Sequence, residues 1–285
     1  MVNKEGDWFM PEREILEKFK VYPTFDKEKY LLQEIEDARN FLNNELNIID
    51  RIEDNTLQLI CIFSLIDCLA QEYYNYPNRE SKQAFCDFVI KYQKQCDYLE
   101  QIEPVTLYYR VEDCIDTKVM IDGFPPEKEV SLENLGWLDA VLVKDILKSN
   151  KSEEISNYLK RKYSEGSVEN VLHEHKLISL IYRMRSKAVH EMSGLGESFM
   201  KMIDVFPNEP YYRDVSRLYV YEGNVVSDDV FELVIPNKFL RNILSDCIEG
   251  YLEDCKIDKH SPFSNNNISR LYRLSWHDTL AKLKN

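Results

Sequence analysis

Apolar residues recur at intervals of three and four positions along most of the chain, a pattern typical of helices that bury one face. The segments with this pattern predict helices over 26–47, 56–75, 79–99, 138–147, 168–192, 237–256 and 268–283, with a further short helix inside 1–25. The first three long helices predict a packed antiparallel bundle. We therefore expect a mainly α protein that forms a single domain over residues 1–285.

Two of the predicted helices have a defined inward face. In helix 56–75 the residues that we expect to be buried are Leu57, Ile60, Cys61, Ser64, Leu65 and Cys68. In helix 79–99 they are Phe85, Phe88, Val89 and Tyr92. These faces place the predicted core between the first helices of the chain.

Two stretches depart from the helical pattern. Residues 104–165 are expected to form a less regular insertion, with a short strand at 105–110. Segments 217–221 and 230–235 have the composition of strands, and turn-forming residues lie between them. We therefore expect a β-hairpin with a longer loop within 213–236.

The formal net charge of −14 favours solubility and argues against a protein that coats nucleic acid with its whole surface. A small basic site remains compatible with this charge. The longest apolar run, 59–69, is shorter than the roughly 20 residues of a membrane span, and residues 1–7 lack the apolar core of a signal peptide. We expect a soluble, cytoplasmic protein without membrane contact.

The seven cysteines are scattered, and no two have CxxC spacing, so we expect reduced thiols that are mostly small core residues. His173 and His175 lie two positions apart, hence about 200° apart around a helix, and are not expected to bind one metal ion together. The sequence also has no P-loop and no GxGxxG motif. We expect neither a metal nor a cofactor.

Residues 176–190 differ in charge from the rest of this acidic chain. They contain four cationic residues, Lys176, Arg183, Arg185 and Lys187, and no Asp or Glu. On a helical wheel one apolar stripe consists of Leu177, Leu180, Ile181, Met184 and Ala188. A second face carries Lys176, Arg183, Lys187 and His190. Arg185 lies beside the apolar stripe, where an arginine must reach solvent, pair with an acid or lie at an interface.

The six residues Arg185-Ser186-Lys187-Ala188-Val189-His190 resemble the R-x(4–6)-H motif of HEPN domains. Ser186 matches the polar residue that often follows the arginine, and Ala188 matches the small residue that often precedes the histidine. The resemblance implies a HEPN-like bundle of four or five helices, with the β-hairpin inserted before the last core helix. The family includes toxins of toxin–antitoxin pairs, anti-phage proteins and CRISPR-associated ribonucleases. In its catalytic members, two protomers bring their Arg and His to one shared, metal-free site that cleaves RNA.

These residue types suit RNA cleavage, because RNA carries its own nucleophile, the 2′-OH. Histidine transfers protons near neutral pH, so the resemblance implies His190 as the acid and base. Arginine offers a fixed set of donors to phosphate oxygens, which is the role implied for Arg185, with Ser186 as a supporting residue. Arg183 is a second candidate, because it precedes His190 by seven residues and shares its face.

Helical geometry adds a requirement for two chains. Arg185 and His190 are five residues apart and point about 140° apart on one helix, so a working site needs a second copy or a distorted helix end. The expected partners are RNA, contacted also by Lys176 and Lys187, and a second copy of the chain as a homodimer. An antitoxin or a defence-system protein is a further candidate partner.

Two other functions are compatible with the sequence. One is a non-catalytic HEPN-like module that binds a nucleotide, RNA or a protein. The other is an unrelated helical scaffold, in which Arg185 is buried against an acid and His190 caps a helix end, where positive charge is favoured. An ion pair that buries Arg185 within its own chain would favour the scaffold, whereas two His190 side chains at a two-fold axis would favour the nuclease.

Overall fold

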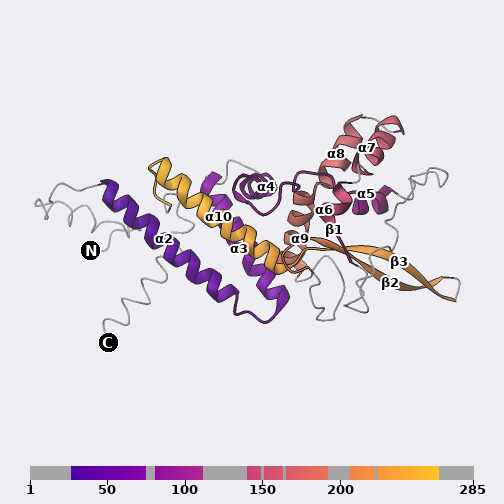
Figure 1. The fold of residues 1–285 in the computed structure, drawn as a ribbon, viewed down its shortest axis with the longest axis horizontal. Coiled ribbons are helices and arrows are strands. Elements are labelled where there is room, and N and C mark those ends of the chain that lie inside the picture. Colours follow the sequence, from indigo (N-terminus) through magenta and orange to yellow (C-terminus); the bar gives the residue numbers. More distant parts are fainter. Residues whose placement is uncertain are drawn as a thin grey trace, which may run out of the picture.

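The computed structural model describes residues 27–74, 81–111, 140–148, 151–162, 165–191, 206–221 and 224–262. Within these ranges the chain is mainly helical and has one small antiparallel sheet (Figure 1), as predicted. The helices expected inside 1–25 and at 268–283 lie outside the described residues. No helix in the described part of the chain combines the length and the apolar character that a membrane crossing requires.

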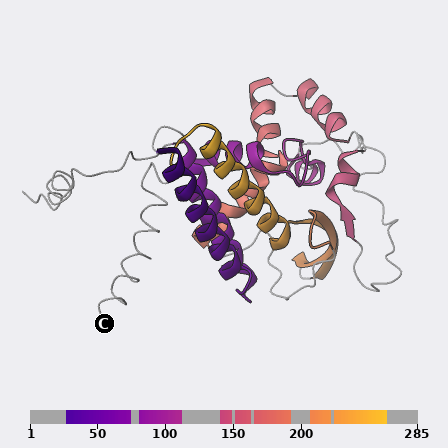
Figure 2. The same cartoon turned by 60° about the vertical axis from the view of Figure 1, so that its left-hand side comes forward.

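The bundle is formed by early helices of the chain together with later ones. Its members are α2 (Lys27–Ile49), α3 (Asn55–Tyr74), α4 (Ser81–Tyr92), α9 (Leu177–Glu191) and α10 (Asn237–Ile257). α10 packs against α2, α3 and α4, and α9 packs against α3 and α4. Figures 1 and 2 both show α10 lying alongside α2, although these helices are far apart in the sequence. The core therefore depends on contacts between distant segments.

The predicted inward face of α3 is only partly confirmed: Leu65 is buried, and Ile60, Cys61 and Cys68 are half-buried against the core. Leu57 is 51% exposed and Ser64 is exposed, although both were expected to be buried. The buried residues of this helix are Leu59, Ile62, Phe63, Leu65, Ile66, Asp67, Leu69, Ala70 and Glu72. Because α3 contacts α2, α4, α9 and α10, these helices cover most of its circumference. A single buried stripe therefore does not describe which of its residues are buried.

The inward face of α4 is confirmed, because Phe85, Phe88, Val89 and Tyr92 are all buried. The helix ends at Tyr92, however, and does not continue to residue 99. Gln93 accounts for the end: its side-chain amide donates to the carbonyl of Cys96 (2.7 Å), and its amide oxygen accepts from the N–H of Cys96 (2.9 Å). These bonds hold the chain in a non-helical conformation after α4.

Residues 104–165, which were expected to be less regular, contain four elements within their described part. They are α5 (Pro104–Val111), β1 (Ala140–Leu142), α6 (Val143–Leu147) and α7 (Lys151–Lys162). The strand predicted at 105–110 is therefore wrong, and the helix predicted at 138–147 is a short strand followed by a short helix.

A buried carboxylate begins α5. The side chain of Glu103, which has no exposed surface, accepts the N–H groups of Val105 and Thr106, both at 2.7 Å. It also accepts hydrogen bonds from the hydroxyls of Thr106 and Tyr212. Pro104 occupies the first helical position, where its missing N–H costs no hydrogen bond. The pair Glu103–Pro104 was therefore the sequence feature that indicated a helix. It comes directly before residues 105–110, which were predicted to form a strand.

The β-hairpin is confirmed, but its strands are longer and its loop is shorter than predicted. β2 (Tyr211–Tyr221) pairs antiparallel with β3 (Asn224–Val234), in a register that brings Tyr221 opposite Asn224. β1 adds to the first residues of β2, so the order of the sheet is β1-β2-β3. In Figure 1 the hairpin extends away from α10.

The helix predicted at 168–192 is two helices, α8 (Glu165–Glu174) and α9. They are separated at His175 and Lys176, where residues 99–103 lie alongside. The carbonyls of Leu99 and Gln101 accept the N–H groups of Ile178 (2.9 Å) and Leu177 (3.1 Å). In return, the carbonyl of His175 accepts the N–H of Glu103 (2.8 Å). This exchange of backbone hydrogen bonds starts α9 at a fixed place on the bundle.

Candidate functional site

The apolar stripe of α9 faces the bundle as predicted. Its members are all buried, and they are Leu177, Leu180, Ile181, Met184 and Ala188. They pack on α3 and α4, which fixes the direction of every other side chain of the helix. The cationic residues of α9 are therefore placed by the burial of this stripe.

Arg185 is held inside its own chain by an ion pair with Asp67 of α3. Its Nε and Nη2 atoms lie 2.6 and 2.5 Å from the same carboxylate oxygen, and the two side chains are only 15% and 11% exposed. The guanidinium also lies 5.6 Å from the centre of the Tyr182 ring. Of the three environments that the sequence allowed for Arg185, the structure contains the pairing with an acid.

Asp67 was missed as a functional candidate, although the sequence carried a signal. It interrupts the apolar run 59–69, and a carboxylate inside such a run needs a partner when it is buried. Nothing in the spacing along the chain connects it with Arg185, which lies 118 residues later. Only the packing of α9 on α3 brings the two together.

Arg183 has the opposite environment. Its side chain is exposed, and Nη2 donates to the carbonyl of Glu174 at the end of α8 (3.2 Å). Lys187, one turn further along α9, is half-buried, as is Ser186. Among the residues that the structure describes, no acid lies within ion-pair distance of Arg183 or Lys187.

His190 lies in the last turn of α9, and its side chain lies outside the described part of the chain. Its helical position is seven residues after Arg183 and three after Lys187, which places the three residues on one face. Arg185 belongs to another face of the helix, toward α3. The structure thus separates the two arginines that the sequence left as alternatives.

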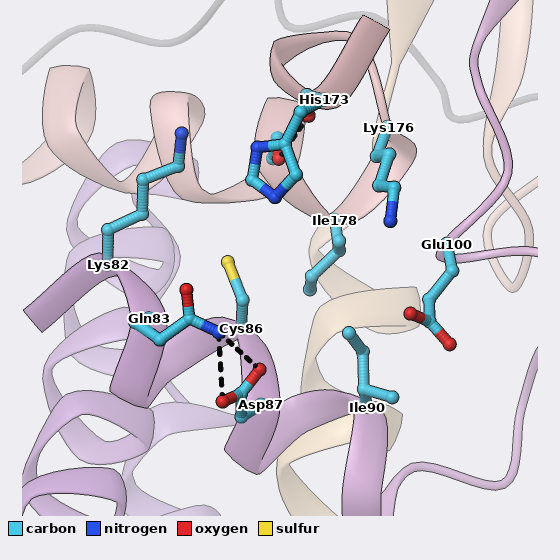
Figure 3. Close-up of a pocket in the computed structure, with 10 residues that line it drawn as sticks. Lys82, Gln83, Cys86, Asp87, Ile90, Glu100, His173, Lys176 and Ile178 are labelled. Atoms are coloured by element: carbon cyan, nitrogen blue, oxygen red, sulfur yellow. Dashed lines mark hydrogen bonds between the residues drawn. The ribbon is translucent and has the colours of Figure 1, made fainter. Parts of the chain in front are cut away.

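Lys176 does not join this group. It precedes Arg183 by seven residues, or about 10 Å along the helix, and lines a pocket at the other end of α9. This pocket has a volume of about 300 Å³ and lies between α4 and the junction of α8 and α9 (Figure 3). Its other lining residues are Lys82, Gln83, Cys86, Asp87, Ile90, Glu100, His173, Ile178 and Ser179. The predicted RNA-binding residues Lys176 and Lys187 therefore belong to different surfaces.

The two neighbouring histidines point to different places, as helical geometry requires. His173 lines the pocket, whereas His175 is buried, and its Nδ1–H donates to the carbonyl of Val171 (2.7 Å). In the described ranges of the chain, no group of three or more His, Cys, Asp or Glu side chains is arranged to hold a metal ion.

A comparison of this chain with known protein families, curated protein sequences and solved structures found no match. Membership of the HEPN family therefore stays a prediction from the Arg185–His190 motif. The functional argument rests on the side chains of α9 and their surroundings.

Proposed function

We propose that the protein is a metal-independent endoribonuclease of the HEPN type that acts as a homodimer. The observation that carries this proposal is that Arg183, Lys187 and His190 lie on one face of α9. Among the described residues, no acid forms an ion pair with Arg183 or Lys187. Such a face attracts the phosphates of RNA in a chain whose net charge is otherwise strongly negative.

In the proposed reaction His190 removes the proton of the ribose 2′-OH. The 2′-oxygen forms a bond to the adjacent phosphorus, and the bond from phosphorus to the 5′-oxygen breaks. His190 of the partner subunit gives a proton to the departing 5′-oxygen. The products are a 2′,3′-cyclic phosphate and a 5′-hydroxyl, and no redox step is needed.

The surroundings of the two arginines favour different roles. Arg183 is exposed and can donate to the phosphate oxygens as negative charge develops on them. Arg185 already forms a hydrogen bond and an ion pair with Asp67, so we assign it a positioning role that holds α9 against α3. Both arginines precede His190 at spacings that the R-x(4–6)-H motif allows, and Ser186 beside them is a supporting residue.

The test is RNA cleavage by the purified protein in the presence of EDTA, with wild type, His190→Ala and Arg183→Ala side by side. We expect fragments with 2′,3′-cyclic phosphate ends from wild type and none from His190→Ala. Arg183→Ala should cleave at least tenfold more slowly. Lys238→Ala, which changes an exposed lysine of α10, is the matched control and should cleave like wild type. RNA left equally intact by all four proteins contradicts the proposal.

The Arg185–Asp67 ion pair, which is largely buried within one chain, favours the unrelated helical scaffold over the nuclease. A second candidate function that keeps the HEPN-like fold is a non-catalytic module. An arginine that is 15% exposed and already paired contributes little to a reacting phosphate. This candidate predicts that labelled RNA binds to wild type, binds more weakly to Arg183→Ala, and stays uncut. If the nuclease activity is found instead, a toxin or anti-phage role with an antitoxin or defence-system partner becomes the next hypothesis to test.

A further inference from the structure

The pocket between α4 and the junction of α8 and α9 gathers basic side chains from three separate segments. Lys82 comes from the first turn of α4, His173 from the end of α8, and Lys176 from the junction itself (Figure 3). Within the described residues, none of the three side chains makes a hydrogen bond or an ion pair with an acid. In an acidic protein this convergence of basic side chains suits the binding of an anion.

Among the described residues, neither acid of the pocket forms a hydrogen bond or an ion pair with Lys82 or Lys176. Both carboxylate oxygens of Asp87 accept hydrogen bonds from the side-chain amide of Gln83, at 2.9 and 3.0 Å. Glu100 lies across the pocket from Lys82 and His173, beside Lys176 (Figure 3). The pocket therefore has a basic side and a side that can accept hydrogen bonds from a ligand's hydroxyl or amino groups.

Two further lining residues, Cys86 and Ser179, carry no charge at neutral pH. Burial raises the pKa of the Cys86 thiol to about 11, although the positive charges of Lys82 and Lys176 act to lower it, so no thiolate repels an anion at neutral pH. The hydroxyl of Ser179, which is 4% exposed, donates to the carbonyl of His173 (2.9 Å) and holds the end of α8 against α9. This hydrogen bond links α8, which supplies His173 to the pocket, to α9, which begins directly after Lys176.

We infer that this pocket binds the phosphate monoester of a nucleotide. Two ammonium groups and an imidazole supply donors to the phosphate oxygens, and Glu100 can accept from a ribose hydroxyl. A volume of about 300 Å³ is at the small end for ligand pockets, which suits one nucleotide. The pocket is about 20 Å from His190 along α9, so this inference does not rest on the proposed nuclease function.

Calorimetric titration of the full chain with inorganic phosphate, adenosine monophosphate and adenosine tests the inference. We expect both phosphate-bearing compounds to bind and adenosine to show no heat. Lys82→Met and Lys176→Met keep an apolar stem of similar length and should each weaken binding at least tenfold. Lys238→Met is the matched control and should bind like wild type. Absence of binding by both phosphate-bearing compounds, or wild-type affinity in both pocket variants, overturns the inference.

A second variant protects the test against loss of binding through misfolding. Glu100 is exposed, so Glu100→Gln should leave the fold intact while it removes a negative charge beside Lys176. Inorganic phosphate should then bind several-fold more tightly, and weaker or unchanged binding contradicts the inference.

Two RNA oligonucleotides, with a 5′-phosphate or a 5′-hydroxyl, separate the sources of the phosphate. We use His190→Ala for both, so that cleavage does not interfere. Tighter binding of the 5′-phosphorylated RNA that is lost in Lys82→Met identifies an RNA end as the ligand. Equal binding of the two RNAs, together with binding of adenosine monophosphate, identifies a free nucleotide.

Discussion

The ion pair between Arg185 and Asp67 makes a quantitative prediction about stability. Replacing Arg185 by Met keeps much of the aliphatic stem but leaves the Asp67 carboxylate, which is 11% exposed, without its guanidinium partner. Removing one member of a buried pair costs about 3–5 kcal/mol, whereas exposed pairs contribute about 0.2–1 kcal/mol. Because this pair is mostly but not fully buried, we expect Arg185→Met to lower the free energy of unfolding by about 2–4 kcal/mol.

Removing both charges should recover most of that loss. A buried ion pair replaced by apolar residues of similar volume is often as stable as the original, so Arg185→Met combined with Asp67→Leu should be more stable than Arg185→Met alone. The pair Arg241–Asp50 is the matched control, since its side chains are 26% and 42% exposed. Arg241→Met should cost about 1 kcal/mol or less.

Urea unfolding followed by circular dichroism measures these differences. If Arg185→Met costs no more than Arg241→Met, or if the double variant loses the sum of its single losses, the ion pair does not hold α9 as argued. The same double variant separates the two roles of Arg185. It should retain RNA cleavage if Arg185 only positions α9, and lose cleavage despite its recovered stability if the guanidinium contacts phosphate.

Further predictions concern packing, titration and thiol reactivity. Gly250→Ala should destabilise the protein by about 1–3 kcal/mol, because the added Cβ would overlap the Tyr92 ring and lie 3.0 Å from its Cγ atom. The control is Gly166→Ala, whose added Cβ meets no atom within 4 Å and should not lower the free energy of unfolding in the same assay. Burial raises the pKa of Glu103, so the folded state holds this proton more tightly than the unfolded state and loses stability as pH rises from its ordinary range. The unfolding free energy of Glu103→Gln minus that of wild type should accordingly increase between pH 4 and pH 7. If this difference is the same at both pH values, the pKa of Glu103 is not raised by folding. The Cys86 thiol, with a pKa of about 11, should react with iodoacetamide slowly at pH 7.5 and faster as pH rises, as mass spectrometry can follow.

Local patterns were reliable for α9 and α4, although each of these helices has more than one neighbour. The buried stripe of α9 and the inward face of α4 followed directly from their apolar spacing. The same reasoning succeeded only in part for α3, because this helix has neighbours on most sides and its partly exposed stripe is as apolar as its buried residues. Spacing along the chain identifies an amphipathic helix, but it does not specify how many neighbours surround it.

Two boundaries also depended on distant residues. The break between α8 and α9 has no Gly or Pro to announce it, and it arises because residues 99–103 take hydrogen bonds that a continuous helix would use. The apolar pattern of α5 is typical of a strand. The segment is helical because the Glu103 carboxylate accepts the N–H of Val105, and Tyr212 from the sheet holds that carboxylate in place. Such backbone competition is decided by tertiary contacts.

The sequence by itself determined that the protein is mainly helical, that it has one β-hairpin, and that residues 176–190 carry four cations and no acid. These properties follow from local periodicity and local charge, which the order of residues contains. Tertiary structure decided the surroundings of each of those cations. Packing α9 on α3 pairs Arg185 with Asp67, whereas Arg183 faces outward and Lys176 joins Lys82 and His173 in a pocket. The electrostatic environment of a charge depends on its neighbours in space, and those neighbours come from parts of the chain that no local pattern connects.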